Sequence, residues 1–123
     1  MVAYRKAVMK SLGAHMGALK SILTDQTQLI DQVGLHAHAI GETAKLMPSM
    51  FPEGSMDPPT EALPVIWENP EGFQAAIDKL AETATALAET ARGGDAQATL
   101  AAFGAMGKQG CGGCHGEFRK KKE

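Results

Sequence analysis

The chain has 123 residues, with 12 basic and 14 acidic side chains, a formal net charge of −2 and two cysteines. This length suits one domain, residues 1–123, and is too short for two. The near-balanced charge excludes a global field that would recruit nucleic acid. No apolar run reaches the roughly 20 residues needed to span a bilayer, so we expect no membrane insertion. Aromatics are few while alanine and methionine are plentiful, which favours closely packed helices over a sheet.

Apolar residues repeat at helical spacing from Tyr4 to about Leu23. The steps alternate between three and four residues, which is typical of a helix packed in a bundle. The members of this stripe are Met9, Leu12, Met16, Leu19 and Leu23, with Arg5 one turn earlier. A flanking stripe consists of Tyr4, Val8, His15 and Ile22. We therefore expect this helix to bury a broad face.

A second helix is predicted from about Gln28 to Met47, ended by Pro48. Its inner face consists of Leu29, Val33, Ile40, Ala44 and Met47. His36 lies between these positions. We expect His15 and His36 to be hydrogen-bonded helix residues rather than ligands, and His38 to face solvent.

Residues 48–69 hold five of the six prolines and read as one long loop. Loops of this length are unusual in a compact domain and are often functional. We expect this loop to wrap the edge of a cofactor, with apolar cover from Phe51, Ile66 and Trp67.

A third helix should begin at Asn69-Pro70-Glu71, which combines an N-cap side chain, a proline at the first position and an early acid. The pair Gly93-Gly94 should end it. Its predicted inner face consists of Phe73, Ile77, Leu80, Ala84, Leu87 and Ala91.

Asp95 can cap a fourth helix. The stripe predicted for it consists of Leu100, Phe103, Gly107, Cys111, Cys114 and Phe118. Several glycines between 104 and 113 predict a close approach of this helix to a neighbouring helix or to a cofactor. Together the four inner faces predict an all-α protein, an antiparallel four-helix bundle with its cofactor near one end.

The strongest signal is Cys111-Gly112-Gly113-Cys114-His115. Two cysteines three residues apart, followed by a histidine, form the pattern for covalent haem attachment. On a helix the three side chains share one face, so two thiols can bind the macrocycle while His115 ligates iron. A redox Cys-x-x-Cys pair would need a βαβ context, and a zinc site would need further soft ligands nearby. We therefore predict one covalent haem c.

With this ending on a four-helix pattern, the chain resembles the cytochrome c-prime family, the class II cytochromes c. The resemblance covers nearly the whole chain and includes Tyr4-Arg5 with Met9, Ile66-Trp67, and Cys111 to Arg119. It implies that Met9 faces the distal side of the iron and that Arg5 approaches a haem propionate. Arg119 is expected among the cofactor-binding residues. The resemblance also implies a homodimer through the first two helices, with which the flanking stripe is compatible.

The resemblance implies two functions. Residues 42–45 and 50–55 look more like the low-spin members, in which methionine is the sixth ligand. We therefore expect a single-electron carrier in a redox chain, with His115 proximal and Met9 distal. The alternative is a five-coordinate protein that binds nitric oxide or carbon monoxide, with Met9 as a steric guard. Met9 supplies no distal acid or base, so we do not expect an enzyme.

Haem c attachment is ordinarily completed outside the cytoplasm, so we expect a bacterial periplasmic protein. The expected partners are a redox protein or a small gas ligand. The basic tail Arg119-Lys120-Lys121-Lys122 has two interpretations, a solvated helix end favoured by the helix dipole or a basic rim that docks an acidic redox partner.

Overall fold

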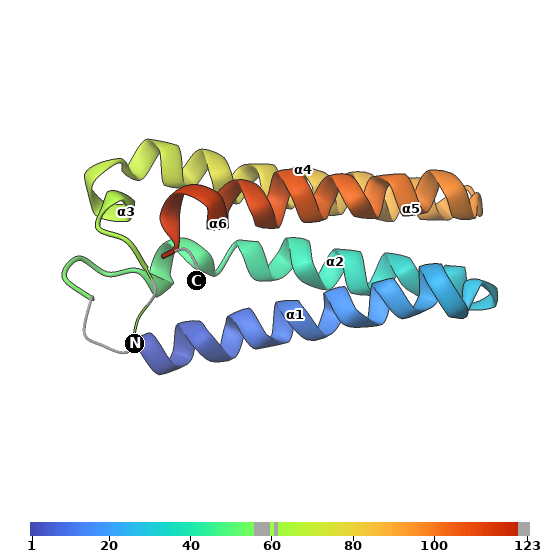
Figure 1. Ribbon diagram of the computed structural model, residues 1–123, viewed down its shortest axis with the longest axis horizontal. Helices are drawn as coiled ribbons and strands as arrows, with labels where there is room; N and C mark the ends of the chain where they lie inside the picture. Colours follow the sequence, from blue (N-terminus) through green and yellow to red (C-terminus); the bar gives the residue numbers. More distant parts are fainter. Residues whose placement is uncertain (56–59, 61, 121–123) are drawn as a thin grey trace.

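Four helical rods pack antiparallel in the computed structural model, which describes residues 1–55, 60 and 62–120. The first rod is α1, Val2–Asp25. It lies beside the second rod, which contains α2 (Val33–Ala44). The third rod, with α4 (Pro70–Arg92), and the fourth, with α5 (Ala96–Ala105) and α6 (Gly112–Phe118), form the opposite side (Figure 1). The start of α1 and the end of α6 lie at the same end of the bundle (Figure 1). The all-α four-helix bundle expected from the sequence is confirmed.

The second rod is not the continuous helix that the sequence predicts. A 3₁₀ segment, Thr27–Gln32, precedes α2, Val33–Ala44, and another 3₁₀ turn follows at Met47–Met50. Leu29 leaves helical geometry, with φ −96° and ψ 19°. Pro48 sits inside the last turn, and because proline disfavours α conformation before it, α2 ends four residues earlier. The predicted inner face is buried from Val33 onward.

The third rod begins as its capping signal predicts. A short helix α3, Val65–Glu68, leads into α4, Pro70–Arg92. The Asn69 side-chain oxygen accepts the Gly72 N–H at 3.1 Å, which satisfies one of the free donors at the helix start. Gly94 follows the helix with φ +73°, a conformation that favours glycine. All six predicted inner-face residues of α4 are buried.

The fourth rod contains α5, Ala96–Ala105, a π-helical segment η3, Met106–Cys111, and α6, Gly112–Phe118. Asp95 caps it by accepting the Ala98 N–H at 3.0 Å. The predicted stripe is wrong at Leu100, which is 45% exposed. The buried seam passes through Thr99 instead, whose hydroxyl donates to the Asp95 carbonyl at 2.7 Å and is thereby satisfied inside the core.

The flanking stripe of α1 is not an exposed apolar face. Val8 and Ile22 are buried within the chain itself, whereas Tyr4 is 50% exposed. His15 and His36 hydrogen-bond to each other, and the His38 side chain is 75% exposed, as expected. In the part of the chain that the structure describes, no helix is both long and apolar enough to cross a membrane.

At Gly110 the fourth rod packs closely against α4, which confirms the predicted role of a glycine here. A Cβ at Gly110 would lie 2.9 Å from Thr83 Oγ1 and 3.2 Å from the Leu80 Cα. By contrast, a Cβ at Gly104 on α5 would meet nothing within 4 Å.

Gly110→Ala should therefore destabilise the fold by about 1–2 kcal/mol, because overpacking outweighs the gain in helix propensity. Chemical denaturation followed by circular dichroism measures the effect. Gly104→Ala is the control and should be neutral or slightly stabilising. Equal stability of the two variants would contradict the close packing at Gly110.

Candidate cofactor site

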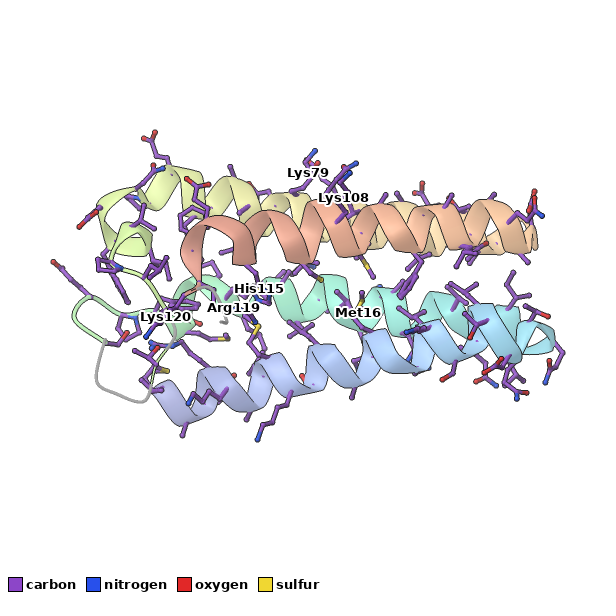
Figure 2. All side chains as sticks on the ribbon, in the orientation of Figure 1. Met16, Lys79, Lys108, His115, Arg119 and Lys120 are labelled. Carbon is purple, nitrogen blue, oxygen red and sulfur yellow. The ribbon has the colours of Figure 1, made fainter. Side chains whose placement is uncertain are left out.

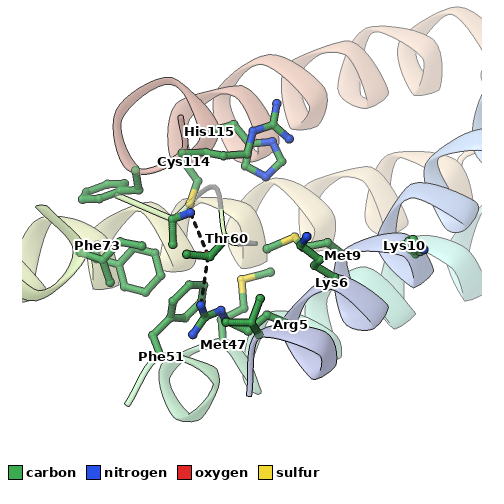
Figure 3. Close-up of a pocket in the computed structure, with 15 residues that line it drawn as sticks. Arg5, Lys6, Met9, Lys10, Met47, Phe51, Thr60, Phe73, Cys114 and His115 are labelled. Atoms are coloured by element: carbon green, nitrogen blue, oxygen red, sulfur yellow. Dashed lines mark hydrogen bonds between the residues drawn. The ribbon is translucent and has the colours of Figure 1, made fainter. Parts of the chain in front are cut away.

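A cavity of about 360 Å³ opens at the end of the bundle where α1 begins and α6 ends. This volume lies in the range of small-molecule and cofactor pockets. Its walls come from the first three turns of α1, from Phe51, Thr60 and Ala62, from the start of α4, and from α6 (Figure 3). The lining is mainly apolar and includes Met47, Phe51, Ile66, Phe73 and Phe118.

One wall carries part of the haem-attachment motif. Cys114 and His115, both on α6, line the cavity, while Cys111 does not. Cys111 is the last residue of η3 and packs half-buried against the core. The motif thus spans a change from π to α geometry, a feature that is frequent at functional sites.

The environment of the two thiols argues against thiolate chemistry. Burial raises the pKa of Cys111, and burial together with the charge of Cys111 raises the pKa of Cys114 to about 11. Redox-active and zinc-binding cysteines need accessible thiolates. Among the described residues, no group of three or more histidine, cysteine or acidic side chains could hold a metal ion. These observations favour thiols that react with a haem.

Met9 lies on α1, across the cavity from His115 (Figure 3). Met16 is on the same helix but does not line the cavity, and it lies further along the bundle (Figure 2). Seven residues separate them, roughly 10 Å of helix. Of the two methionines on the predicted stripe, Met9 is therefore the one placed at the cavity.

Arg5 is buried in the cavity wall, with 4% of its surface exposed. Its Nη1 donates to the Met50 carbonyl at 3.2 Å and to Ser55 Oγ at 2.7 Å. Its Nη2 donates to the Ser55 carbonyl at 2.8 Å and to Thr60 Oγ1 at 3.2 Å. The guanidinium also lies over the Phe51 ring, 4.8 Å from its centroid.

These contacts make Arg5 the anchor of the loop that closes the cavity. Burial lowers the pKa of Arg5 because it penalises the charged form. Among the described residues, Arg5 has no ion pair with a carboxylate. A buried charge is normally paired, so an anionic ligand group in the cavity would fit the position.

Arg5→Leu should lower both the stability and the haem reduction potential. Unmade hydrogen bonds at Met50 and Ser55 should cost about 1–3 kcal/mol, and loss of a nearby cation disfavours the reduced haem. Denaturation and potentiometry measure the two effects. Lys6→Leu, an exposed cation on the same cavity, should leave the stability unchanged. An unchanged stability and potential in Arg5→Leu would contradict both proposed roles of Arg5, the anchoring of the loop and the supply of positive charge beside the cofactor.

The cavity lining includes four cationic side chains, of which the sequence predicted only Arg5 and Arg119. Lys6 and Lys10 also line the cavity, and no acidic residue does among those described. They share one face of α1 with Val2, Arg5 and Met9, because residues three or four positions apart on a helix are neighbours. This spacing is the sequence signal that could have predicted the two lysines. Haem has two propionates, and a cationic apolar cavity with a thiol and an imidazole on one wall fits it.

The stretch 48–69, predicted as one long loop, instead contains the end of the 3₁₀ turn Met47–Met50 and the short helix α3. Two of the three residues expected to cover the cofactor line the cavity. Phe51 and Ile66 line the cavity, whereas Trp67 does not. The Trp67 Nε1–H donates to the Phe51 carbonyl at 3.0 Å and to the Pro52 carbonyl at 3.2 Å. Trp67 therefore holds the backbone of Phe51 and Pro52 in place without lining the cavity itself. The predicted loop residues 56–59 and 61 lie outside the described residues.

The basic tail is not a solvated helix end at Arg119. The last helix ends at Phe118, and Arg119 is extended, with φ −121° and ψ 143°. It pairs with Ala62 in an isolated antiparallel bridge, half-buried and lining the cavity. His115, Arg119 and Lys120 lie together at this end of the bundle (Figure 2). Lys79 and Lys108 instead point outward from the side formed by the third and fourth rods. Lys121 and Lys122 lie outside the described residues.

Comparison with known proteins gives one consistent result. The sequence profile of the family described as cytochrome c′ matches residues 1–119. The cytochrome c′ of Pararhodospirillum photometricum is 39% identical over 120 residues, 97% of this chain and 95% of that protein. The structure of the cytochrome c′ of Rhodopseudomonas palustris has a TM-score of 0.87 at 32% identity, over 99% and 97% of the two chains. A further cytochrome c′ structure, described as having a ligand-controlled dimer dissociation, has a TM-score of 0.85 at 28% identity, over 98% and 94%.

Proposed function

Because the chain belongs to the cytochrome c′ family and is a haem c protein, we propose that it carries single electrons, with His115 and Met9 as the axial ligands of iron. The observation that carries this proposal is the position of the two side chains. They line one cavity from opposite walls, on α6 and α1. A thioether as sixth ligand raises the haem potential and leaves no open position, which suits electron transfer.

Cys111 and Cys114 would hold the cofactor through thioether bonds. When bound, the haem supplies the redox-active iron. The chain's own residues then set its environment: apolar side chains exclude water, and burial tunes the potential. Arg5, Lys6, Lys10 and Arg119 offer positive charge to the propionates. The only imidazole among the lining residues is His115, so within this lining no distal imidazole is placed for acid–base catalysis.

The cations at the cavity suggest the chemistry of the redox partner. Lys6, Lys10 and Lys120 are exposed at this end of the bundle. These three exposed lysines would attract an acidic surface of a partner protein and increase the rate at which the two proteins associate. Covalent haem attachment and bacterial relatives support a periplasmic location. A homodimer is supported by the dimer named for one related structure.

A second candidate function is the binding of nitric oxide or carbon monoxide, with Met9 as a steric guard. The related cytochrome c′ with ligand-controlled dimer dissociation favours it, because there a ligand acts on the assembly. Methionine is unbranched and flexible, so Met9 could swing aside for a small ligand.

Absorption spectra of the oxidised and reduced protein, with and without carbon monoxide, separate the two functions. Electron transfer with Met9 bound predicts low-spin spectra that carbon monoxide leaves unchanged. High-spin spectra and ready binding of carbon monoxide would overturn the electron-transfer proposal in favour of gas binding.

A further inference from the structure

Two histidines face each other across the contact between α1 and α2. The Nδ1 atoms of His15 and His36 lie 2.9 Å apart. The ring centroids are 5.2 Å apart and the ring planes are inclined by 59°. Both residues are half-buried. At this separation one Nδ1 donates a proton that the other accepts, so one proton lies between the two rings.

Neither ring takes part in the proposed haem function, because neither lines the cavity. Burial and the neighbouring His15 lower the pKa of His36, which favours its neutral form. Neutral imidazole, through either ring nitrogen, is the commonest metal ligand in proteins. The pair thus presents two such nitrogens from two different helices.

We propose that His15 and His36 together bind one divalent transition-metal ion through their Nδ1 atoms, and that copper(II) fits their spacing best. The proton now carried by one Nδ1 moves to the Nε2 of the same ring, so both ligands are neutral imidazoles. In a tetragonal site, two neighbouring nitrogens at about 2.0 Å from the ion lie about 2.8–2.9 Å apart. The observed Nδ1 separation already has this value. In the hydrogen bond the two Nδ1 atoms point at each other, so both rings would have to rotate about their Cβ–Cγ bonds to direct their lone pairs at one ion.

Zinc(II) fits the same pair less well. Tetrahedral coordination at about 2.0–2.1 Å places two nitrogens about 3.3 Å apart, so the pair would have to open by about 0.4 Å. Copper(II) also leads the general affinity order of divalent metals. Among the described residues no third histidine, cysteine or acidic side chain joins the pair. Water would therefore complete the coordination, and the ion would exchange readily.

The ion would tie α1 to α2, since each helix contributes one ligand. Unfolding separates the two ligands, and an ion that binds only the folded chain stabilises it. Copper(II) should therefore raise the melting temperature of the haem-loaded protein. The proposed metal site at His15 and His36 lies outside the cavity lining. Metal binding there therefore does not depend on which ligand occupies the distal side of the haem.

The test is a copper(II) titration of the haem-loaded protein, followed by electron paramagnetic resonance and thermal melting. We expect one ion per chain, hyperfine structure from two nitrogens, and a raised melting temperature. His15→Gln and His36→Gln should each weaken binding about tenfold or more, the loss typical of damaged metal sites. His38→Gln is the matched control, because His38 lies two residues from His36 with its side chain 75% exposed. It should change the affinity less than about twofold.

The spectrum of the unmodified protein decides the proposal even if a variant fails to fold. Hyperfine structure from one nitrogen, or no saturable binding, would overturn it. An equal loss of affinity in His38→Gln would also overturn it, because it would assign copper binding to exposed histidines in general. Zinc(II), titrated in parallel by calorimetry, should bind more weakly than copper(II).

Discussion

Met9→Ala should convert the haem iron from low spin to high spin and open the distal side to carbon monoxide. Met9 lines the cavity opposite His115, so its removal deletes the proposed sixth ligand without touching the proximal one. If the open state is about 1% populated in the unmodified protein, a permanently open site raises the apparent affinity for carbon monoxide about 100-fold. Absorption spectra and carbon monoxide titration measure the change.

Met16→Ala is the matched control for this experiment. Met16 is also a half-buried methionine on α1, but it lies outside the cavity lining. Its truncation should leave the spin state and the carbon monoxide affinity unchanged. Identical spectra of Met9→Ala and the unmodified protein would remove Met9 from the iron and leave it the role of a guard.

Replacing both cysteines should abolish covalent attachment of the haem. The intact mass of the unmodified protein should include one haem after acid–acetone extraction, whereas Cys111→Ala combined with Cys114→Ala should lose it entirely. The reason is that no other cysteine exists in the chain.

The single variants should differ in how much haem they keep. Cys114 lines the cavity and Cys111 does not, so Cys114→Ala should retain less covalent haem than Cys111→Ala. Mass spectrometry of the extracted proteins measures both fractions. Free extraction of the haem from the unmodified protein would contradict covalent attachment altogether.

Local signals in the sequence predicted the helix boundaries best. Asn69 and Asp95 cap their helices with side-chain bonds to residues three positions on, an interaction that depends on neighbours in the chain alone. The boundaries of the second rod were harder to predict. Its breaks at Leu29 and before Pro48 come from backbone geometry that apolar spacing does not encode.

The seam of the fourth rod shows why periodicity alone has limits. Leu100 is more apolar than Thr99, so hydrophobic spacing placed Leu100 inside. The threonine is buried because its hydroxyl finds a backbone acceptor one turn earlier, a local bond that cancels its polarity. Six residues of π geometry then change the register of the helix before the cysteines.

The candidate site was predictable where its residues form a contiguous motif. Cys114 and His115 are neighbours in the chain, and both line the cavity. Lys6 and Lys10 were overlooked because lysine is usually assigned to solvent, although they share the stripe of Met9. The loop anchored by Arg5 joins residues about 50 positions apart, and such pairings follow from the tertiary fold.

Two walls of the cavity come from opposite ends of the chain, residues 2–10 and 114–119. Most contacts of the bundle join rods that follow one another in the chain, whereas these two walls meet only after more than a hundred residues have been ordered between them. Closing so long a loop adds an entropic cost that grows slowly with its length, and contacts of large sequence separation form slowly. A thioether-bound haem would stay beside His115 in the unfolded chain. If Met9 is the sixth ligand, as proposed, it would have to bind the iron again on each folding event. The rate at which Met9 binds the iron would then report the folding step in which residues 2–10 and 114–119 come together.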